Sequence, residues 1–317
     1  MTYEELLLQT ALEDERIVVM TAENRALVRN APRVLGSRFV DTGITEQTMI
    51  GMAAGLALRG RIPIVHALAA FLTMRAFEFI RTDAGIAHLP VKLSGYIPGF
   101  LSDGNGPTHQ AIEDVAILRG IPGMEVYCPA DEADLVGMLP HIWQTAAPAY
   151  VRINHRKGSY SHSPYRPGKA EIVAEGRDLT LLVYGFLFEN ALRTRDLLEA
   201  AGLSVGLINL RSLKPVDEEV LLRVAASPGR LVTIEDHLQT GGLYSIVAEV
   251  LLRHRMTADV LSLSLGERWF KPGLLAQVLE NEGFTPERMA LRIKDHWTDL
   301  VPAGTGTENK NSLIYAQ

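Results

Sequence analysis

Residues 41–47 read DTGITEQ, and the run TMIGMAAGLAL follows them at residues 48–58. The first stretch places one carboxylate, Glu46, at the entrance to an apolar helix expected over residues 48–58. Glycine and alanine fill five of the eleven positions in that helix, so a flat group can approach its backbone closely. Acidic residues are also common in the first turn of helices, where they complement the helix dipole. Glu46 therefore becomes a candidate for chemistry only in the company of other residues.

A second polar stretch, NGPTHQ, occupies residues 105–110. Its histidine, His109, is of a type that titrates near neutral pH and can relay a proton, although a lone histidine is more often structural. Gly104 and Gly106 let the backbone approach a substrate beside it. Between the two stretches, Phe71 offers a flat apolar face at the start of a helix expected over residues 71–84. The order is carboxylate, aromatic ring, histidine.

Composition narrows the classes of function. The chain has 317 residues, 47% of them hydrophobic and 21% charged, and a net charge of −6. Basic residues do not cluster, so nucleic acid is not expected as a partner. One cysteine, Cys128, excludes an internal disulfide framework and most cysteine-based metal sites. The acidic start does not resemble a signal peptide, and no apolar run reaches membrane-spanning length. We expect a cytoplasmic protein without membrane contact.

Short apolar runs alternate with helical periods, which predicts an α/β fold with largely parallel sheets. Strands are expected at residues 17–20, 63–67, 91–94, 124–128 and 149–153, and again at 179–184, 205–210 and 230–234. Glycine, proline and charged residues replace this pattern in between. We therefore expect a first domain at 1–155, a linker at 156–177, a second domain at 178–300 and a polar tail at 301–317.

Several motifs together resemble the transketolase family. They are GITEQ (43–47), AAGLA (53–57), PIV (63–65) with FL (71–72), GPTHQ (106–110), and VTIEDH (232–237) with GG (241–242). The nearest members are transketolase and 1-deoxyxylulose-5-phosphate synthase, and the likeness spans roughly residues 10–295. The resemblance implies two consecutive three-layer α/β domains: a thiamine-diphosphate-binding (Pyr) fold, then a fold like the transketolase C-terminal domain.

The resemblance also assigns roles at a thiamine diphosphate site. Glu46 would hydrogen-bond the pyrimidine ring, which favours the tautomer that takes the proton from the thiazolium carbon. Phe71 falls at the position that stacks on that ring, and Ile44 would also contact the cofactor. His109 matches the histidine that faces the substrate, where it would bond a hydroxyl or keto oxygen and relay a proton.

Substrate contacts are less typical of the family. Asn105 stands where transketolases usually carry aspartate, so it can hydrogen-bond substrate without adding charge. Arg152 and Arg156 fall near the arginine that binds phosphate, and either would suit that role. The loop at 96–100 has no histidine or arginine to hold a sugar phosphate. We therefore expect two-carbon transfer to an unusual or unphosphorylated acceptor.

One part of the family pattern is missing. Transketolases hold the diphosphate through Mg²⁺, with a Gly-Asp-Gly motif and a later asparagine in a separate N-terminal domain. This chain has no such motif, and DGN at 103–105 lies in the substrate loop without ligand spacing. We expect no metal ligand here, and a second polypeptide that carries the diphosphate domain and most Mg²⁺ contacts. An α2β2 heterotetramer is the expected form.

The favoured interpretation is thus the C-terminal subunit of a split transketolase, which transfers a two-carbon ketol unit from a ketose to an aldehyde. The β subunit of a 2-oxo-acid dehydrogenase is an alternative, since it has the same layout and a glutamate in a comparable loop. A non-catalytic scaffold subunit is the third interpretation.

Overall fold

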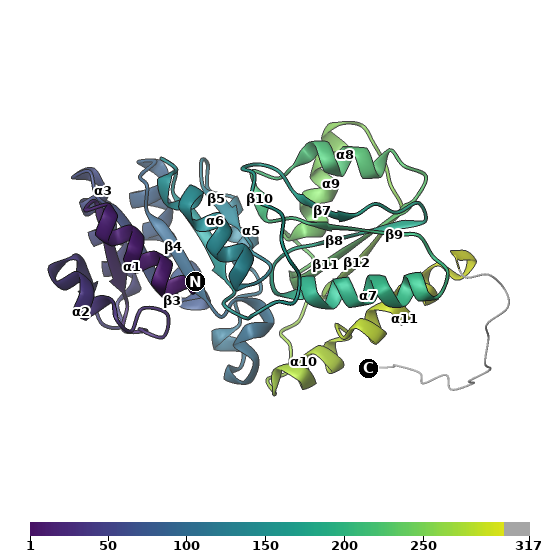
Figure 1. The fold of residues 1–317 in the computed structure, drawn as a ribbon, viewed down its shortest axis with the longest axis horizontal. Coiled ribbons are helices and arrows are strands. Elements are labelled where there is room, and N and C mark those ends of the chain that lie inside the picture. Colours follow the sequence, from purple (N-terminus) through teal and green to yellow (C-terminus); the bar gives the residue numbers. More distant parts are fainter. Residues whose placement is uncertain (301–317) are drawn as a thin grey trace.

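A computed structural model describes residues 1–300, which form two α/β units joined side by side (Figure 1). The first unit is built on a seven-stranded sheet and the second on a five-stranded sheet. The α/β fold expected from the sequence is therefore confirmed.

The first sheet has the strand order β10-β5-β6-β4-β3-β1-β2. Its strands are β1 (Ile17–Thr21), β2 (Phe39–Asp41), β3 (Ile62–Leu68), β4 (Lys92–Tyr96), β5 (Glu125–Tyr127), β6 (Ala149–Ile153) and β10 (Ser212–Lys214). All pair in parallel except β10, which pairs antiparallel with β5. Because parallel strands end at the same edge, the segments that follow β2, β3 and β4 emerge together.

Helices cover both faces of this sheet. Side chains alternate along β1, so Ile17 and Val19 pack on one face while Val18 and Met20 pack on the other. The first face is covered by α1 (Tyr3–Glu13), α2 (Ala31–Leu35) and α6 (Glu132–Gln144). The second face is covered by α3 (Glu46–Leu58), α5 (Asp114–Arg119) and the helical segment 71–86. Strands buried on both sides explain the continuous apolar runs in the sequence.

The second sheet has the order β12-β11-β8-β9-β7. Its strands are β7 (Glu171–Ala174), β8 (Leu179–Val183), β9 (Val205–Asn209), β11 (Arg230–Leu238) and β12 (Val260–Leu265). Its helices are α7 (Phe188–Ala200), α8 (Glu218–Ala225), α9 (Leu243–Arg253), α10 (Leu275–Glu282) and α11 (Pro286–His296). Helices α7, α10 and α11 pack on one face, and α8 and α9 on the other.

The two units share structure more closely than the sequence predicts. Leu182 and Ile208 of the second sheet belong to the same buried cluster as Val65 and Leu93 of the first. Strand β10 also leaves the second unit's part of the sequence to complete the first sheet. The apolar core is therefore continuous from one unit to the other.

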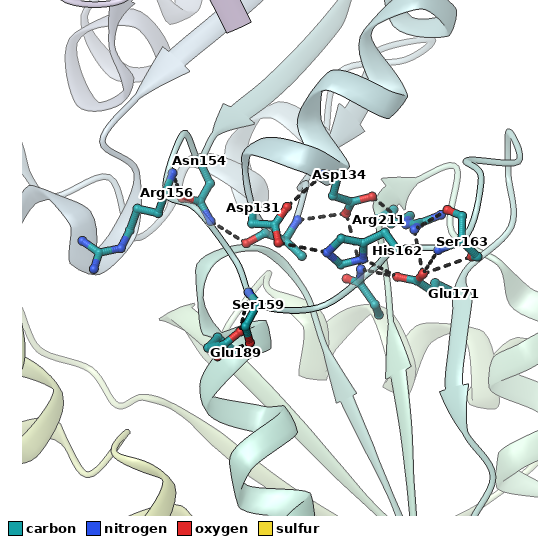
Figure 2. A network of polar contacts seen from close by, with 12 residues as sticks. Asp131, Asp134, Asn154, Arg156, Ser159, His162, Ser163, Glu171, Glu189 and Arg211 are labelled. Carbon is teal, nitrogen blue, oxygen red and sulfur yellow. Dashed lines mark hydrogen bonds and ion pairs between the residues drawn. The ribbon is translucent and has the colours of Figure 1, made fainter. Parts of the chain in front are cut away.

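A network of buried ion pairs lies where the two units are connected (Figure 2). His162 lies between Asp131 at 3.1 Å and Glu171 at 2.8 Å, and Arg211 pairs with Glu171 and with Asp134, each at 2.8 Å. Burial disfavours the imidazolium, but the hydrogen bonds to Asp131 and Glu171 outweigh it and raise the pKa of His162 to about 9. We call these five residues the linker cluster.

Two segments differ from the expected secondary structure. Residues 171–174, within the range expected as linker, form β7 because β9 offers them an antiparallel partner. The helix expected over 71–84 consists of π-helical turns at Phe71–Arg75 and Ile80–Ile86 around α4 (Phe77–Phe79). Such turns are frequent at functional sites. The expected tail at 301–317 lies outside the described residues. Among residues 1–300, no helix is long and apolar enough to span a bilayer.

Candidate active site

Glu46 lies at the edge of the first sheet where parallel strands end. Strand β2 ends at Asp41, whose carboxylate accepts a hydrogen bond from the Gly43 amide at 3.0 Å. Gly43 has a φ of 69°, which favours glycine, and the chain turns there into α3. Glu46 is the first residue of that helix and only 2% exposed. The expected position at a helix entrance is therefore observed, but the carboxylate is buried, unlike an ordinary helix-end acid.

The Phe71 ring lies at the same edge. It follows β3, which pairs in parallel with β1, and it begins the first π-helical turn. The ring is half-buried and contacts the ring of His109 edge to face, with centroids 4.9 Å apart. Phe71 and His109 are 38 positions apart in the sequence, but their rings are in contact in the folded chain.

Arg75 connects Glu46 to Phe71. Its Nη1 donates to Glu46 Oε2 at 2.8 Å, and its guanidinium carbon lies 4.1 Å from the centre of the Phe71 ring. Arg75 is not among the residues predicted from the sequence. The available signal was its spacing from Phe71, because helical residues four positions apart lie on the same face. Its ion pair with Glu46 joins segments 29 residues apart and is not readable from spacing.

His109 projects from the loop that follows β4. Gly106, with φ of 83°, turns the chain so that the His109 amide donates to the Gly106 carbonyl at 3.0 Å. The Nδ1 atom of His109 lies 2.9 Å from Thr108 Oγ1, and no partner is found for Nε2 among the described residues. The next residue, Gln110, donates to the Phe270 carbonyl at 2.8 Å and ties this loop to the second unit. The loop is therefore anchored while His109 remains half-exposed.

The other candidate residues are placed differently. Asn105 is exposed, and its Nδ2 donates to the Ser102 carbonyl at 2.9 Å. Ile44 is 68% exposed in the loop before α3. A contact between this exposed side chain and a cofactor stays a prediction.

Arg152 does not fit the expected role of a substrate ligand. Its Nε donates to Asp114 at 2.9 Å and its Nη1 to Asp236 at 2.6 Å, and the side chain is only 3% exposed. Its guanidinium also lies 5.4 Å from the centre of the Tyr184 ring. Arg152 is thus neutralised between the two units.

Arg156 remains accessible. Its side chain is exposed, with the guanidinium 5.7 Å from the centre of the Phe186 ring. It lines a cavity of about 550 Å³ between the units, together with Lys157, Arg193 and the acidic Glu189. Of the two arginines, only Arg156 can meet a ligand.

Candidate metal ligands do not cluster among the described residues. Residues 1–300 contain no group of three or more histidine, cysteine, aspartate or glutamate side chains placed to hold a metal ion. The groups that the site brings together are a buried carboxylate, an aromatic ring, an imidazole and a guanidinium, from Glu46, Phe71, His109 and Arg75.

Comparison with known families identifies the class of protein. Residues 1–159 match the transketolase pyrimidine binding domain, and residues 168–289 match the transketolase C-terminal domain. The chain belongs to the transketolase family.

Within that family, the chain is similar to several proteins over most of their length. It is 38% identical over 255 residues to the 6-deoxy-6-sulfo-D-fructose transketolase subunit SqwH of Clostridium sp. (strain MSTE9), covering 79% of each chain. It is 31% identical over 300 residues to a putative transketolase C-terminal section of Methanocaldococcus jannaschii, covering 92% of this chain and 94% of that one. A solved split gene transketolase, an inactive beta4 tetramer, superposes with a TM-score of 0.84 at 32% identity, covering 93% of this chain and 97% of that one.

Longer members are also related. A 1-deoxy-D-xylulose-5-phosphate synthase from Synechococcus sp. (strain WH7803) is 35% identical over 268 residues, which span 83% of this chain but only 41% of that enzyme. The chain is thus a homologue of split transketolase subunits, and the resemblance found in the sequence is confirmed.

Proposed function

We propose that this chain is the C-terminal subunit of a split, thiamine-diphosphate-dependent transketolase. It would move a two-carbon ketol unit from a ketose donor to an aldehyde acceptor. The observation that carries the proposal is the meeting of Glu46, Phe71 and His109 at one sheet edge, in a chain homologous to split transketolase subunits.

The residues at this edge suit the aminopyrimidine half of the cofactor. Glu46 is a buried carboxylate whose hydrogen-bond partner, the Arg75 guanidinium, is itself flat and lies on the Phe71 ring. A planar donor group therefore already fits against both residues. Glu46 would hydrogen-bond the pyrimidine nitrogen and share a proton with it, Phe71 would stack on the ring, and thiamine diphosphate would supply the nucleophilic carbon for the transferred unit.

His109 is assigned to the substrate. Its Nδ1 is occupied by Thr108, which leaves Nε2 to hydrogen-bond a hydroxyl or keto oxygen of the sugar and to hold or move a proton there. Asn105 lies in the same loop, and its Oδ1 can accept a hydrogen bond from a substrate hydroxyl. Arg156 is an exposed cation just after the end of β6 and is assigned to an anionic substituent.

The remaining cofactor contacts are assigned to a partner. The described residues lack a metal-ligating cluster, so we propose that a second polypeptide holds the diphosphate and Mg²⁺, in an α2β2 assembly. We further propose an unusual or unphosphorylated acceptor, because the loop at 96–100 carries no cation. The related subunit named for 6-deoxy-6-sulfo-D-fructose indicates that the family accommodates uncommon sugars.

The test is reconstitution. The chain is co-expressed with the product of the adjacent open reading frame, and the complex is assayed for thiamine diphosphate binding and for ketol transfer between sugars with a phosphate, a sulfonate or no anion. Glu46→Gln should abolish turnover while the complex still assembles. Full activity of that variant would overturn the cofactor assignment. Equal turnover of ordinary pentose phosphates and uncommon substrates would refute the substrate proposal.

A further inference from the structure

Arg75 contacts both side chains that are assigned to the cofactor, Glu46 and Phe71. Its Nη1 donates to Glu46 at 2.8 Å, and the guanidinium carbon lies 4.1 Å from the centre of the Phe71 ring. Arg75 starts from the same π-helical turn as Phe71, so one short segment carries both the stacking ring and the cation on it. While Arg75 stays there, Glu46 Oε2 and the face of Phe71 that the guanidinium covers are both occupied.

The contact excludes a second ring from the face of Phe71 that Arg75 covers. Aromatic rings that pair with a phenylalanine have centroids about 4.5–7 Å apart, so a guanidinium at 4.1 Å fills the space that such a ring needs. A guanidinium is planar, donates hydrogen bonds and stacks on aromatic faces. It therefore resembles an aminopyrimidine in shape, and it offers a carboxylate the same N–H hydrogen bond as the ring does when its nitrogen carries a proton.

We propose that Arg75 holds the place of the aminopyrimidine in the cofactor-free chain and must swing outward to admit it. This inference rests on the proposed function, because it treats Glu46 and Phe71 as the cofactor's partners. The Arg75 side chain is 37% exposed, so an outward path to solvent exists. Arg75 is a positioning residue in this account and takes no part in ketol transfer.

The contact between Arg75 and Glu46 affects stability and cofactor affinity in opposite ways. Glu46 is 2% exposed, and an unpaired charge at such a site is strongly unfavourable, so Arg75 stabilises the empty site. The same contact lowers cofactor affinity, because only molecules with Arg75 turned outward can bind. Removing Arg75 should therefore lower the stability of the free chain and raise its affinity for the cofactor, two effects of opposite sign.

The experiment compares Arg75→Gln with the matched control Arg81→Gln. Arg81 is exposed in the next π-helical segment and has no ion pair among the described residues, so its loss changes the net charge equally. Affinity for thiamine diphosphate with Mg²⁺ is measured by titration calorimetry on the reconstituted complex, and the melting temperature is measured on the free chain. We expect Arg75→Gln to tighten binding about three- to tenfold and to lower the melting temperature, while Arg81→Gln changes neither.

A second variant separates the two contacts of Arg75. Arg75→Lys keeps the charge but loses the planar stack, so its affinity should fall between wild type and Arg75→Gln. In a Glu46→Gln background, Arg75→Gln should no longer lower the melting temperature of the free chain, because the ion pair is already gone.

The outcomes are distinguishable. If the wild-type complex binds the cofactor and Arg75→Gln binds it equally or more weakly, the place-holding role is wrong while the proposed function stands. If the wild-type complex and every variant fail to bind, the proposed function fails and this inference fails with it.

Discussion

Arg152 on β6 and Asp236 on β11 form an ion pair of 2.6 Å that joins the two sheets. Asp114, at the start of α5, completes a buried triad with Arg152 at 2.9 Å. Burial disfavours charge on Asp236, and its pKa is raised in spite of the opposing effect of Arg152. The guanidinium is thus held between two carboxylates and is not directed at a ligand.

The first prediction follows from this triad. Arg152→Met should lower the free energy of unfolding by about 3–5 kcal/mol, because two carboxylates lose their buried partner. Chemical denaturation of the free chain measures this change, with Arg156→Met as an exposed control near the end of the same strand. A stable Arg152→Met protein with weakened binding of phosphorylated sugars would instead restore the substrate role.

A pH dependence is expected from the linker cluster. The pKa of His162 in the folded chain, about 9, exceeds the ordinary value of 6.5. Its stabilising effect is therefore complete below pH 6.5 and is lost as the pH rises through 9. Glu171, whose pKa is lowered to about 2 by hydrogen bonds that outweigh burial, acts in the opposite direction: its contribution is present above pH 4.5 and is lost as the pH falls through 2.

The measurement compares wild type with His162→Gln. The difference in free energy of unfolding should be largest, of order 1–3 kcal/mol, between pH 5 and 6.5 and should shrink toward pH 9.5. Charged neighbours of the ring are Asp131, Glu171, Asp134 and Arg211. A difference that stayed constant from pH 6 to pH 10 would show that His162 acts by packing alone.

His109→Asn tests the substrate role of the imidazole. The variant keeps hydrogen-bonding capacity but cannot exchange a proton near neutral pH, so kcat should fall by about a hundredfold. The dissociation constant of thiamine diphosphate should change less than twofold, because His109 contacts Phe71 only through its ring edge. An equal loss in cofactor affinity and kcat would place His109 on the cofactor.

Phe71→Leu tests the stacking surface. Leucine keeps apolar volume but loses the flat face, so cofactor affinity should fall about three- to tenfold. Phe79→Leu is the matched control, since Phe79 belongs to the same helical segment and is 38% exposed. If both variants bound the cofactor as tightly as wild type, Phe71 would be an ordinary core residue.

The sequence allows prediction of those site residues that directly follow strands of the first sheet. Glu46, Phe71 and His109 each follow a different strand of one sheet, so the α/β pattern predicts that they converge at one edge. Arg75 escaped notice because its importance depends on Glu46 lying above the π-helical turn, a tertiary contact.

The partners of Arg152 were hidden for a related reason. The resemblance places Arg152 near a phosphate-binding arginine, whereas its partners Asp114 and Asp236 are 38 and 84 residues away and reach it only in the folded chain. The strand β10 was equally hidden, because the run at 212–214 is short and pairs with β5, 85 positions earlier. Long-range pairing of short segments leaves no local periodicity to read.

Strand β10 has a consequence for synthesis of the chain. The edge of β5 exposes unpaired backbone groups until residues 212–214 have left the ribosome, long after the other strands of the first sheet are complete. An exposed edge is a template for pairing with another chain. The first sheet is therefore complete only once residues 212–214 have been synthesised, and a chain that ended before β10 would leave the β5 edge open.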